Sequence, residues 1–226
     1  MPAQRKPDYS VHMSYVVNLA VEGRLAAVIG AGHVAARKIQ ALLAAGARVI
    51  VVAPQACGSV IALAQEKRIQ LQVKVYTKAD IDGAFVVVCA TNDEEVNARV
   101  ASDAASMGVL VNVVDQPALC SFTVPATVRR GNLTLAVATD GRCPALAGIL
   151  RDELDRRYGL EYSALVDLFA DLREAMIAQN WDGRRIRETL AELYRDGVTG
   201  FIARGEHELL NGFLRSRLRA PFPLPR

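Results

Sequence analysis

Short apolar runs alternate with segments of helical periodicity along the first half of the chain. Leu25–Gly30 is a run of aliphatic residues that stops at a glycine, as a buried parallel strand does. In His33–Ala45 the larger apolar residues recur every three or four positions, which is typical of an amphipathic helix. The predicted strands are Leu25–Gly30, Arg48–Ala53, Leu71–Tyr76, Ala84–Ala90 and Gly108–Val114, and the predicted helices are His33–Ala45, Ser59–Lys67 and Asp93–Met107. This alternation predicts an α/β domain built on a doubly wound parallel sheet.

The pattern changes after Asp115. Two β-rich runs, Ser121–Val128 and Leu133–Thr139, are joined by residues 129–132, so we expect an antiparallel hairpin. From Pro144 onward every segment has helical periodicity, and a proline suits the first turn of a helix. The predicted helices are Pro144–Arg157, Tyr162–Gln179, Arg184–Arg195 and Glu206–Arg219. The second half should therefore be mainly helical, with a proline-rich extended tail at 221–226.

The composition is that of a globular cytosolic protein. The 226 residues are enough for one or two domains, and 51% apolar with 23% charged residues excludes extensive disorder. No apolar run approaches the roughly 18 residues of a membrane span. Residues 1–10 are polar and lack the apolar core of a signal peptide, so we expect a cytoplasmic location and no membrane partner.

Charge and metal-binding residue types narrow the expected partners further. The net charge of +3 is too small to indicate nucleic-acid binding, although positive residues that converge locally would suit an anionic small molecule. The four cysteines contain no CxxC pair, and the three histidines are widely separated. We therefore expect no resident metal site and no disulfide.

A glycine-rich turn follows the first predicted strand. Residues 30–35 form a GxGxxA motif between a strand and a helix, which is the context that dinucleotide binding requires. Gly30 permits the tight turn, Gly32 lets the backbone approach a pyrophosphate, and Ala35 allows close packing of helix on strand. The helix N-terminus would then face the phosphates. The alternative interpretation is a tight turn that binds no ligand.

The expected dinucleotide site extends to the carboxyl ends of neighbouring strands, where open α/β sheets bind ligands. An acidic residue that binds the ribose usually ends the second strand. Ala53 and Pro54 stand there instead, so this pattern does not decide between NAD and NADP. The expected cofactor-binding residues are Gly30, Gly32, His33, Val34, Ala53, Pro54, Thr91 and Asn92.

Two aspartates follow the fourth and fifth predicted strands at the same edge. Asp115 comes directly after an apolar strand, near the expected position of a nicotinamide, and is a candidate general base. The sequence leaves open an alternative, in which Asp115 is a turn residue before Gln116 and Pro117. Asp93 is better explained as the N-cap of the next helix.

Basic residues form a third candidate cluster around the predicted hairpin. The arginine fork binds carboxylates in a bidentate manner, so these side chains suit an acidic substrate. The alternative is a solvated surface, and we expect that alternative for Arg37 and Lys38 on the first helix. The clustered arginines are Arg129, Arg130, Arg142 and Arg151, and the expected substrate-binding residues are Asn112, Arg129, Arg130 and Arg142.

Four longer stretches of the sequence resemble one known family. VIGAGHVAARKIQALLAAGARVIVVAP, CATNDEEVNARVA, VNVVDQPALCSFTVPATVRRGNL and GRCPALAGILRDEL are similar to the precorrin-2 dehydrogenases. These include stand-alone enzymes and the N-terminal half of multifunctional siroheme synthases. The resemblance covers residues 15–172, and its VNVVD-P-x-x-C-x-F-x-x-PA stretch is much more specific than GxGxxA.

The resemblance implies NAD-dependent oxidation of precorrin-2, an octacarboxylate tetrapyrrole, to sirohydrochlorin. Some family members also insert ferrous iron, as a substrate, to make siroheme. The family's catalytic aspartate falls on Asp115 and its dinucleotide turn on Gly30 and Gly32. The resemblance also implies a homodimer with an intertwined segment. The expected domains are a Rossmann domain at 1–114, a dimerisation hairpin at 115–143 and a helical domain at 144–220, followed by the tail at 221–226.

Cys143 departs from the family pattern, because many relatives have a serine there that is phosphorylated in some members. We interpret Cys143 as a small residue at a helix N-terminus rather than as a metal-handling thiol. Two other functions stay open: a non-enzymatic NAD(H)-sensing protein and a chelatase without redox chemistry. The Asp115 loop and the arginine turn favour the dehydrogenase, because a sensor needs no base for its substrate.

Overall fold

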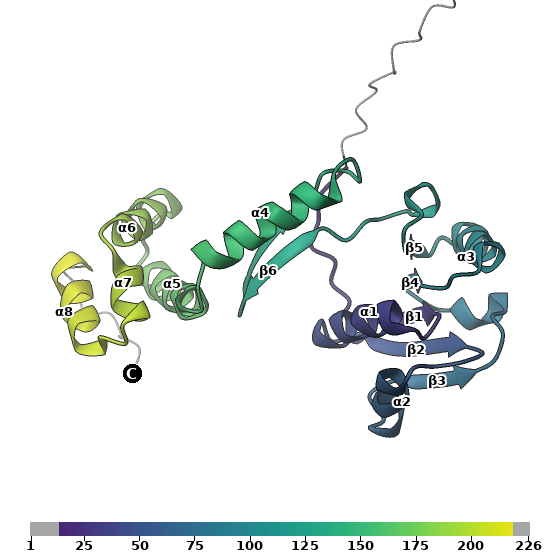
Figure 1. Ribbon diagram of the computed structural model, residues 1–226. Coiled ribbons are helices and arrows are strands. Elements are labelled where there is room, and N and C mark those ends of the chain that lie inside the picture. The colour runs from purple at the N-terminus through teal and green to yellow at the C-terminus, as the bar shows by residue number, and fades with distance from the viewer. Residues whose placement is uncertain (1–13, 219–226) are drawn as a thin grey trace, which may run out of the picture. The chain divides into compact units, whose positions relative to one another are not determined.

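The computed structural model describes residues 14–218, and its first compact unit is built on a five-stranded sheet (Figure 1). The strands are β1 (Leu25–Ile29), β2 (Arg48–Ala53), β3 (Gln70–Val73), β4 (Val86–Cys89) and β5 (Leu110–Val113). They lie in the order β3-β2-β1-β4-β5, and every pairing is parallel. The predicted doubly wound sheet is confirmed.

The path of the chain reverses at β1. The chain runs outward from β1 through β2 to β3 and then returns to place β4 on the other side of β1. The carboxyl ends of β1 and β4 therefore form a topological switch point, where open α/β sheets bind ligands. Two backbone bonds extend the pairing here: Gly30 N–H donates to Val52 O over 2.9 Å, and Ala90 N–H donates to Ile29 O over 2.8 Å. The glycine turn is thus fixed at the switch point.

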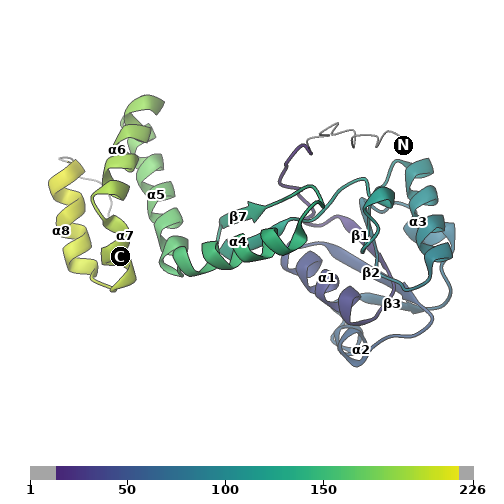
Figure 2. The same cartoon turned by 45° about the horizontal axis from the view of Figure 1, so that its top comes forward.

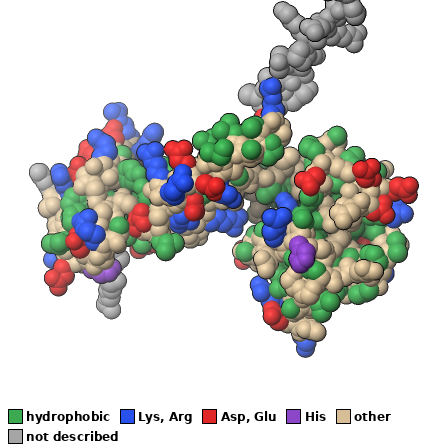
Figure 3. Space-filling view, in the orientation of Figure 1, with side chains coloured by type: hydrophobic (Ala, Val, Ile, Leu, Met, Phe, Trp, Pro, Cys, Tyr) green, Lys and Arg blue, Asp and Glu red, His purple; other side chains and the backbone are tan. Residues whose placement is uncertain are grey.

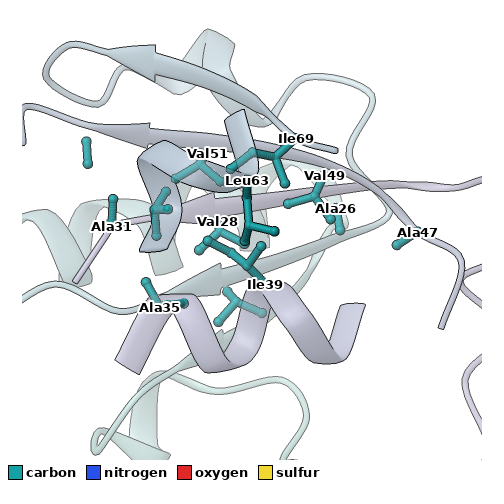
Figure 4. Packing of buried hydrophobic residues seen from close by; sticks show 14 of the residues in the cluster. Ala26, Val28, Ala31, Ala35, Ile39, Ala47, Val49, Val51, Leu63 and Ile69 are labelled. Atoms are coloured by element: carbon teal, nitrogen blue, oxygen red, sulfur yellow. The ribbon is translucent and has the colours of Figure 1, made fainter. Parts of the chain in front are cut away.

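Helices cover both faces of this sheet (Figure 2). They are α1 (His33–Ala44), α2 (Gly58–Gln65) and α3 (Glu94–Met107), with 3₁₀ turns at η1 (Lys78–Ile81) and η2 (Pro117–Leu119). On one face, Ile39 of α1 and Leu63 of α2 pack against Val28 and Val51 (Figure 4). On the other face, α3 packs through Val100. Burial on both faces explains why the strands read as continuous apolar runs rather than alternating ones.

Asp93 starts α3 as its N-cap, as predicted. Its carboxylate accepts hydrogen bonds from the N–H groups of Glu95, over 3.0 Å, and Val96, over 3.1 Å. These are two of the N–H groups that the helix itself leaves without partners. The helix ends at Gly108, whose φ of 67° is a common way to end a helix.

The segment after β5 covers the open edge of the sheet. β5 is an edge strand, so its outer backbone groups lack a partner strand. Val111 N–H donates to Ser121 Oγ over 2.7 Å, and Ser121 N–H donates back to Val111 O over 2.8 Å. Asn112 Nδ2 donates to Phe122 O over 3.0 Å. The Cys-Ser-Phe part of the long sequence motif therefore has a structural role, because it provides hydrogen-bonding partners for polar groups of β5.

The chain divides into two compact units between Val124 and Pro125. The second unit begins with an antiparallel pair, β6 (Ala126–Arg130) and β7 (Leu133–Val137). The predicted hairpin is confirmed, but the expected four-residue turn at 129–132 is wrong. Arg130 pairs with Leu133, so the turn consists of residues 131–132 and both hairpin arginines lie in a strand.

Gly131 explains the tight turn. Its φ of 54° lies in the left-handed region that glycine adopts without strain. A Cβ at this position would also collide with the Ser163 side chain. Glycine is therefore required here both for the backbone conformation and for close packing of the turn.

The rest of the second unit is helical. Its helices are α4 (Pro144–Arg157), α5 (Glu161–Ala178), α6 (Gly183–Arg195), α7 (Val198–Ala203) and α8 (His207–Leu218). The core shared by α5 to α8 includes Leu165, Leu168, Leu172, Met176, Leu193, Val198, Leu210 and Leu214. The short helix α7 was not predicted, because its 6 residues carry too little periodicity to be recognised in sequence.

Some sequence expectations lie outside these observations. The tail at 221–226 and residues 1–10 fall outside the described range, and the domain boundaries after residues 114 and 143 stay predictions. The third strand is shorter than expected and ends at Val73, whereas Tyr76 is buried and donates its hydroxyl to Asp103 Oδ2 over 3.0 Å. Among residues 14–218, no helix is both long and apolar enough to span a bilayer.

Candidate functional site

Gly30 is a glycine that the fold requires. It follows β1 with a φ of 104°, a conformation that other residues rarely adopt. A Cβ at this position would collide with the carbonyl group of Ala90, where β4 ends beside β1. The first glycine of the motif therefore allows two strand ends to approach each other.

Gly32 is different, because the fold itself does not require a glycine there. Its φ of −83° and ψ of −172° are extended values that any residue adopts. A Cβ at Gly32 would meet no heavy atom within 4 Å. The space that this glycine leaves open lies in front of the N-terminus of α1, where a pyrophosphate approaches the backbone in dinucleotide-binding folds.

The first turn of α1 suits an anion. Gly32 is the N-cap, and no side chain caps the helix or places a negative charge in its first turn. The leading N–H groups and the positive end of the helix dipole are therefore available to phosphate oxygens. His33 and Val34 are exposed in this turn, beside the same space. The residues present thus fit the diphosphate of NAD or NADP.

The loop after β2 lies next to the glycine turn. Cys57 N–H donates to Ala31 O over 2.9 Å and ties this loop to the motif. Ala53 is buried at the end of β2, whereas Pro54 is exposed. The two residues thus lie beside the turn, as their proposed place in the cofactor site requires.

A buried amide fixes the loop after β4. Asn97 is 3% exposed, and its Oδ1 accepts from Thr91 Oγ1 over 2.7 Å and from Cys89 Sγ over 3.1 Å. Its Nδ2 donates to the Thr91 carbonyl over 3.3 Å. Asn92, the next residue of the loop, is exposed at the same edge of the sheet. Burial also raises the pKa of the Cys89 thiol to about 12, so this thiol stays protonated.

Sequence reasoning did not identify Asn97 as part of this region. One signal was present, because Asn97 precedes Ala101 and Ala104 on the apolar face of the predicted helix. A polar residue on such a face is normally satisfied by a specific hydrogen-bonding partner.

Asp115 lies in an exposed turn directly after β5. Its φ of 59° places it in the left-handed region, which aspartate tolerates better than most residues with a side chain. Val114 N–H donates to Cys89 O over 2.9 Å, so the turn that follows β5 begins beside the end of β4. Asp115 therefore lies at the carboxyl edge of the sheet, on the same edge as the glycine turn.

The Cys120 thiol holds the Asp115 turn closed. Its Sγ accepts from Val113 N–H over 3.1 Å and lies 3.2 Å from Val113 O and 3.4 Å from Gln116 O. These atoms flank Asp115 on both sides in sequence. The cysteine of the family-like motif therefore fixes the backbone that carries the candidate base.

Lys38 of α1 lies close enough to Asp115 to interact with its charge. Burial lowers the pKa of the Lys38 ammonium, Arg37 lowers it further, and Asp115 and Cys120 raise it. The expectation of a fully solvated side chain is wrong for Lys38, which is half-buried, whereas Arg37 is exposed. Spacing in the sequence could not show this, because Lys38 and Asp115 meet only through the fold.

The expected substrate-binding residues have different environments. Asn112 is buried, and its side-chain amide donates to Phe122 O in the segment that follows β5. Arg130 Nε donates to Tyr158 O over 2.8 Å, and its Nη2 lies 2.9 Å from Asp155 Oδ1. Arg129 and Arg142 are exposed in the second unit. Much of the hydrogen-bonding capacity of Arg130 is thus used to attach the hairpin to α4.

Cys143 is the exposed N-cap residue of α4. Its N–H donates to Thr139 Oγ1 over 3.2 Å, and its thiol does not cap the helix. Within residues 14–218, no group of three or more His, Cys, Asp or Glu side chains is arranged to hold a metal ion.

Comparisons with known proteins agree with the dinucleotide-binding fold of the first unit. A family model for NAD(P)-binding domains matches residues 17–126. The siroheme synthase of Methylobacillus flagellatus is 35% identical over 181 residues, which are 80% of this chain and 39% of that protein. The siroheme synthase of Ectopseudomonas mendocina is 34% identical over 203 residues, which are 90% of this chain and 44% of that protein. The chain therefore spans less than half the length of these curated relatives.

A solved structure is similar over nearly the whole chain. The precorrin-2 dehydrogenase SirC superposes with a TM-score of 0.71 at 26% identity, and the match covers 92% of this chain and all of SirC. The match includes both the sheet unit and the helical unit. The family model and these relatives together show that the chain belongs to the siroheme synthase and precorrin-2 dehydrogenase family.

Proposed function

We propose that this protein oxidises precorrin-2 to sirohydrochlorin, with NAD as the hydride acceptor. One arrangement carries the proposal: the open space at Gly32 and the exposed carboxylate of Asp115 share the carboxyl edge of one sheet. A cofactor that takes a hydride and a base that takes a proton are what this oxidation needs at a common site.

The chain's own residues bind, orient and take up the proton. The backbone at Gly32 and the first turn of α1 would hold the diphosphate of NAD, which supplies the hydride acceptor when bound. The hydride leaves a ring carbon of precorrin-2, and the accompanying proton leaves the macrocycle for the Asp115 carboxylate. The Cys120 contacts fix the backbone of the turn that carries this carboxylate.

Positive side chains would recognise the eight carboxylates of precorrin-2. Lys38 places an ammonium group beside Asp115 and would attract a substrate carboxylate to the base. In the second unit we propose Arg129 and Arg142 as carboxylate-binding residues, because both are exposed. Arg130 contributes chiefly by holding the hairpin against α4.

We propose that the protein is a homodimer through its second unit. A two-stranded hairpin is marginal alone, and the helix that packs on it, α4, also presents an apolar face. Leu146, Ile149 and Leu150 lie one turn apart on α4 and are 45%, 63% and 38% exposed. Figure 3 shows apolar side chains gathered over the N-terminal half of this helix. A second copy would cover this surface.

We propose the cytoplasm as the compartment. All four cysteines are free thiols, including Cys143, which is exposed. Exposed thiols persist in a reducing compartment, and a soluble nicotinamide cofactor is available there.

Replacement of the candidate base tests the proposed chemistry. Asp115→Asn keeps the size of the side chain but removes the proton acceptor, so kcat for NADH formation from precorrin-2 should fall by about 10²–10⁴-fold. NAD affinity should stay unchanged, because the diphosphate contacts lie at α1. Both quantities can be measured by anaerobic absorbance assays and by calorimetry.

A matched control separates this effect from a general loss of charge. Asp182→Asn removes an exposed carboxylate that only caps α6, and asparagine caps equally well. Its activity should equal that of the unmodified protein. Wild-type activity in Asp115→Asn would make Asp115 a turn residue only. Assays with ferrous iron would show whether iron insertion occurs and whether it depends on the same carboxylate.

A further inference from the structure

A concave surface lies at the amino edge of the parallel sheet, opposite to the glycine turn. Its volume is about 510 Å³, and it is formed by residues that precede or begin β1, β2, β4 and β5. Its lining includes Arg24, Arg48, Asp82, Phe85, Met107 and Val109. All of them belong to the first compact unit. The proposed dehydrogenase chemistry uses none of these residues.

The two arginines of this surface are held in place by the protein. Arg48 Nε donates to Gly23 O over 3.0 Å. The Arg24 guanidinium stacks on Phe85, with Cζ 3.9 Å from the ring centroid. Each contact leaves guanidinium N–H groups that can donate to a ligand, because an arginine has five N–H donors in a planar fork.

Neither guanidinium is neutralised by a neighbouring carboxylate. Of the ion pairs within residues 14–218, none includes Arg24 or Arg48. Asp82 also lines the surface, but it does not lie within ion-pair distance of either arginine. Two oriented, unpaired cations in one concave surface favour an anion over a neutral ligand.

We propose that this concave surface is a second anion-binding site, in which Arg24 and Arg48 together bind a carboxylate or phosphate group of a small organic molecule. Met107 and Val109 would contact the carbon part of the ligand. Asp82 would repel a second negative group, so the site should prefer a ligand with one anionic group at the arginines. Because the site lies at the opposite edge of the sheet, NAD should neither compete with this ligand nor be required for it.

Calorimetric titration of the full chain with two probe anions tests the site. Butyrate, which carries one carboxylate on a short carbon chain, and inorganic phosphate are titrated separately at constant ionic strength, with and without saturating NAD, and the tighter probe identifies the preferred oxyanion. Arg24→Gln and Arg48→Gln should each weaken binding about tenfold or more, the value of a lost charge-assisted hydrogen bond. Asp82→Asn should strengthen binding.

The matched control is Arg68→Gln, which removes the same charge from an exposed arginine outside the concave surface. It should bind the anions as the unmodified chain does. Circular dichroism and the NAD affinity of each variant check that the sheet unit is intact. Wild-type anion affinity in both Arg24→Gln and Arg48→Gln would overturn the proposal. So would binding that NAD abolishes, or no binding of either anion by the unmodified chain.

This outcome is independent of the proposed dehydrogenase activity. A chain that oxidises precorrin-2 but binds no anion at Arg24 and Arg48 loses only the second site. A chain that binds the anion but forms no NADH loses only the proposed activity.

Discussion

The parallel sheet of the first unit and helix α4 of the second unit bury their apolar residues to different extents. In the first unit, helices cover both faces of the sheet, and every residue of β4 is buried. In the second unit, α4 buries only Ala147 and leaves Leu146, Ile149 and Leu150 exposed. The sheet of the first unit is therefore covered on both faces, whereas α4 of the second unit retains apolar surface that a partner can cover. We propose on this basis that cofactor chemistry belongs to the first unit and assembly to the second.

The largest expected effect concerns NAD binding by the first unit. Gly32→Val should abolish NAD binding and leave the fold intact, because the extended backbone accepts valine and a Cβ there meets no heavy atom within 4 Å. The added methyl groups would occupy the space for the pyrophosphate. Calorimetry with NAD and thermal unfolding measure the two expectations.

Gly30→Ala provides the contrast within the same motif. Its methyl group would collide with the Ala90 carbonyl, and its φ of 104° is unfavourable for alanine. This variant should lower the melting temperature or fail to fold, unlike Gly32→Val. Unchanged NAD affinity in Gly32→Val would remove Gly32 from the cofactor site.

A smaller effect is expected on the proposed dimerisation through α4. Ile149→Asp should weaken dimerisation by about 100-fold or more, because it removes buried apolar area and places a charge in the interface. NAD affinity should not change. Light scattering over a range of protein concentrations measures the association.

Ile177→Asp is the matched control for that variant. Ile177 is 47% exposed on α5, outside the apolar face of α4, so its replacement should leave the dimer unchanged. A monomeric unmodified chain at micromolar concentration, or an Ile149→Asp variant that dimerises normally, would contradict the assignment of assembly to α4.

The smallest expected effect concerns Lys38. Its pKa is lowered in the folded protein, chiefly by burial, so the protonated side chain opposes folding at neutral pH. Lys38→Met should therefore raise the melting temperature slightly at neutral pH, and the gain should shrink as the pH rises toward the ordinary lysine pKa of about 10.4. Differential scanning calorimetry at several pH values measures this.

The same variant should bind precorrin-2 less well, although it should be more stable. Lys38→Met should raise the KM for precorrin-2, whereas Lys38→Arg should restore it, because arginine keeps the positive charge. A Lys38→Met variant that is less stable at neutral pH and has wild-type KM would show that the lysine has only a packing role.

The sequence predicted the first unit well because its strands are buried on both faces. Runs such as Ala84–Ala90 have few polar residues and end at turn-forming positions, so their type and order follow from the pattern alone. The glycine motif and the N-cap role of Asp93 are local features, and the structure places both as expected.

Residues whose environment depends on distant segments could not be predicted. Lys38 resembles a solvated helix residue until β5 brings Asp115 near it. The hairpin turn was drawn too long because the fit of Gly131 against Ser163, from another helix, is invisible in the local sequence. Each case requires knowledge of which elements pack together.

The most direct test of the proposed function is the stoichiometry of one reaction. The unmodified chain is mixed anaerobically with precorrin-2 and NAD, and the absorbance spectra of NADH and sirohydrochlorin are followed together. One NADH should form for each sirohydrochlorin, and neither should form without NAD. Sirohydrochlorin formed without NADH, or no reaction at all with both substrates present, would contradict the assignment as an NAD-dependent precorrin-2 dehydrogenase.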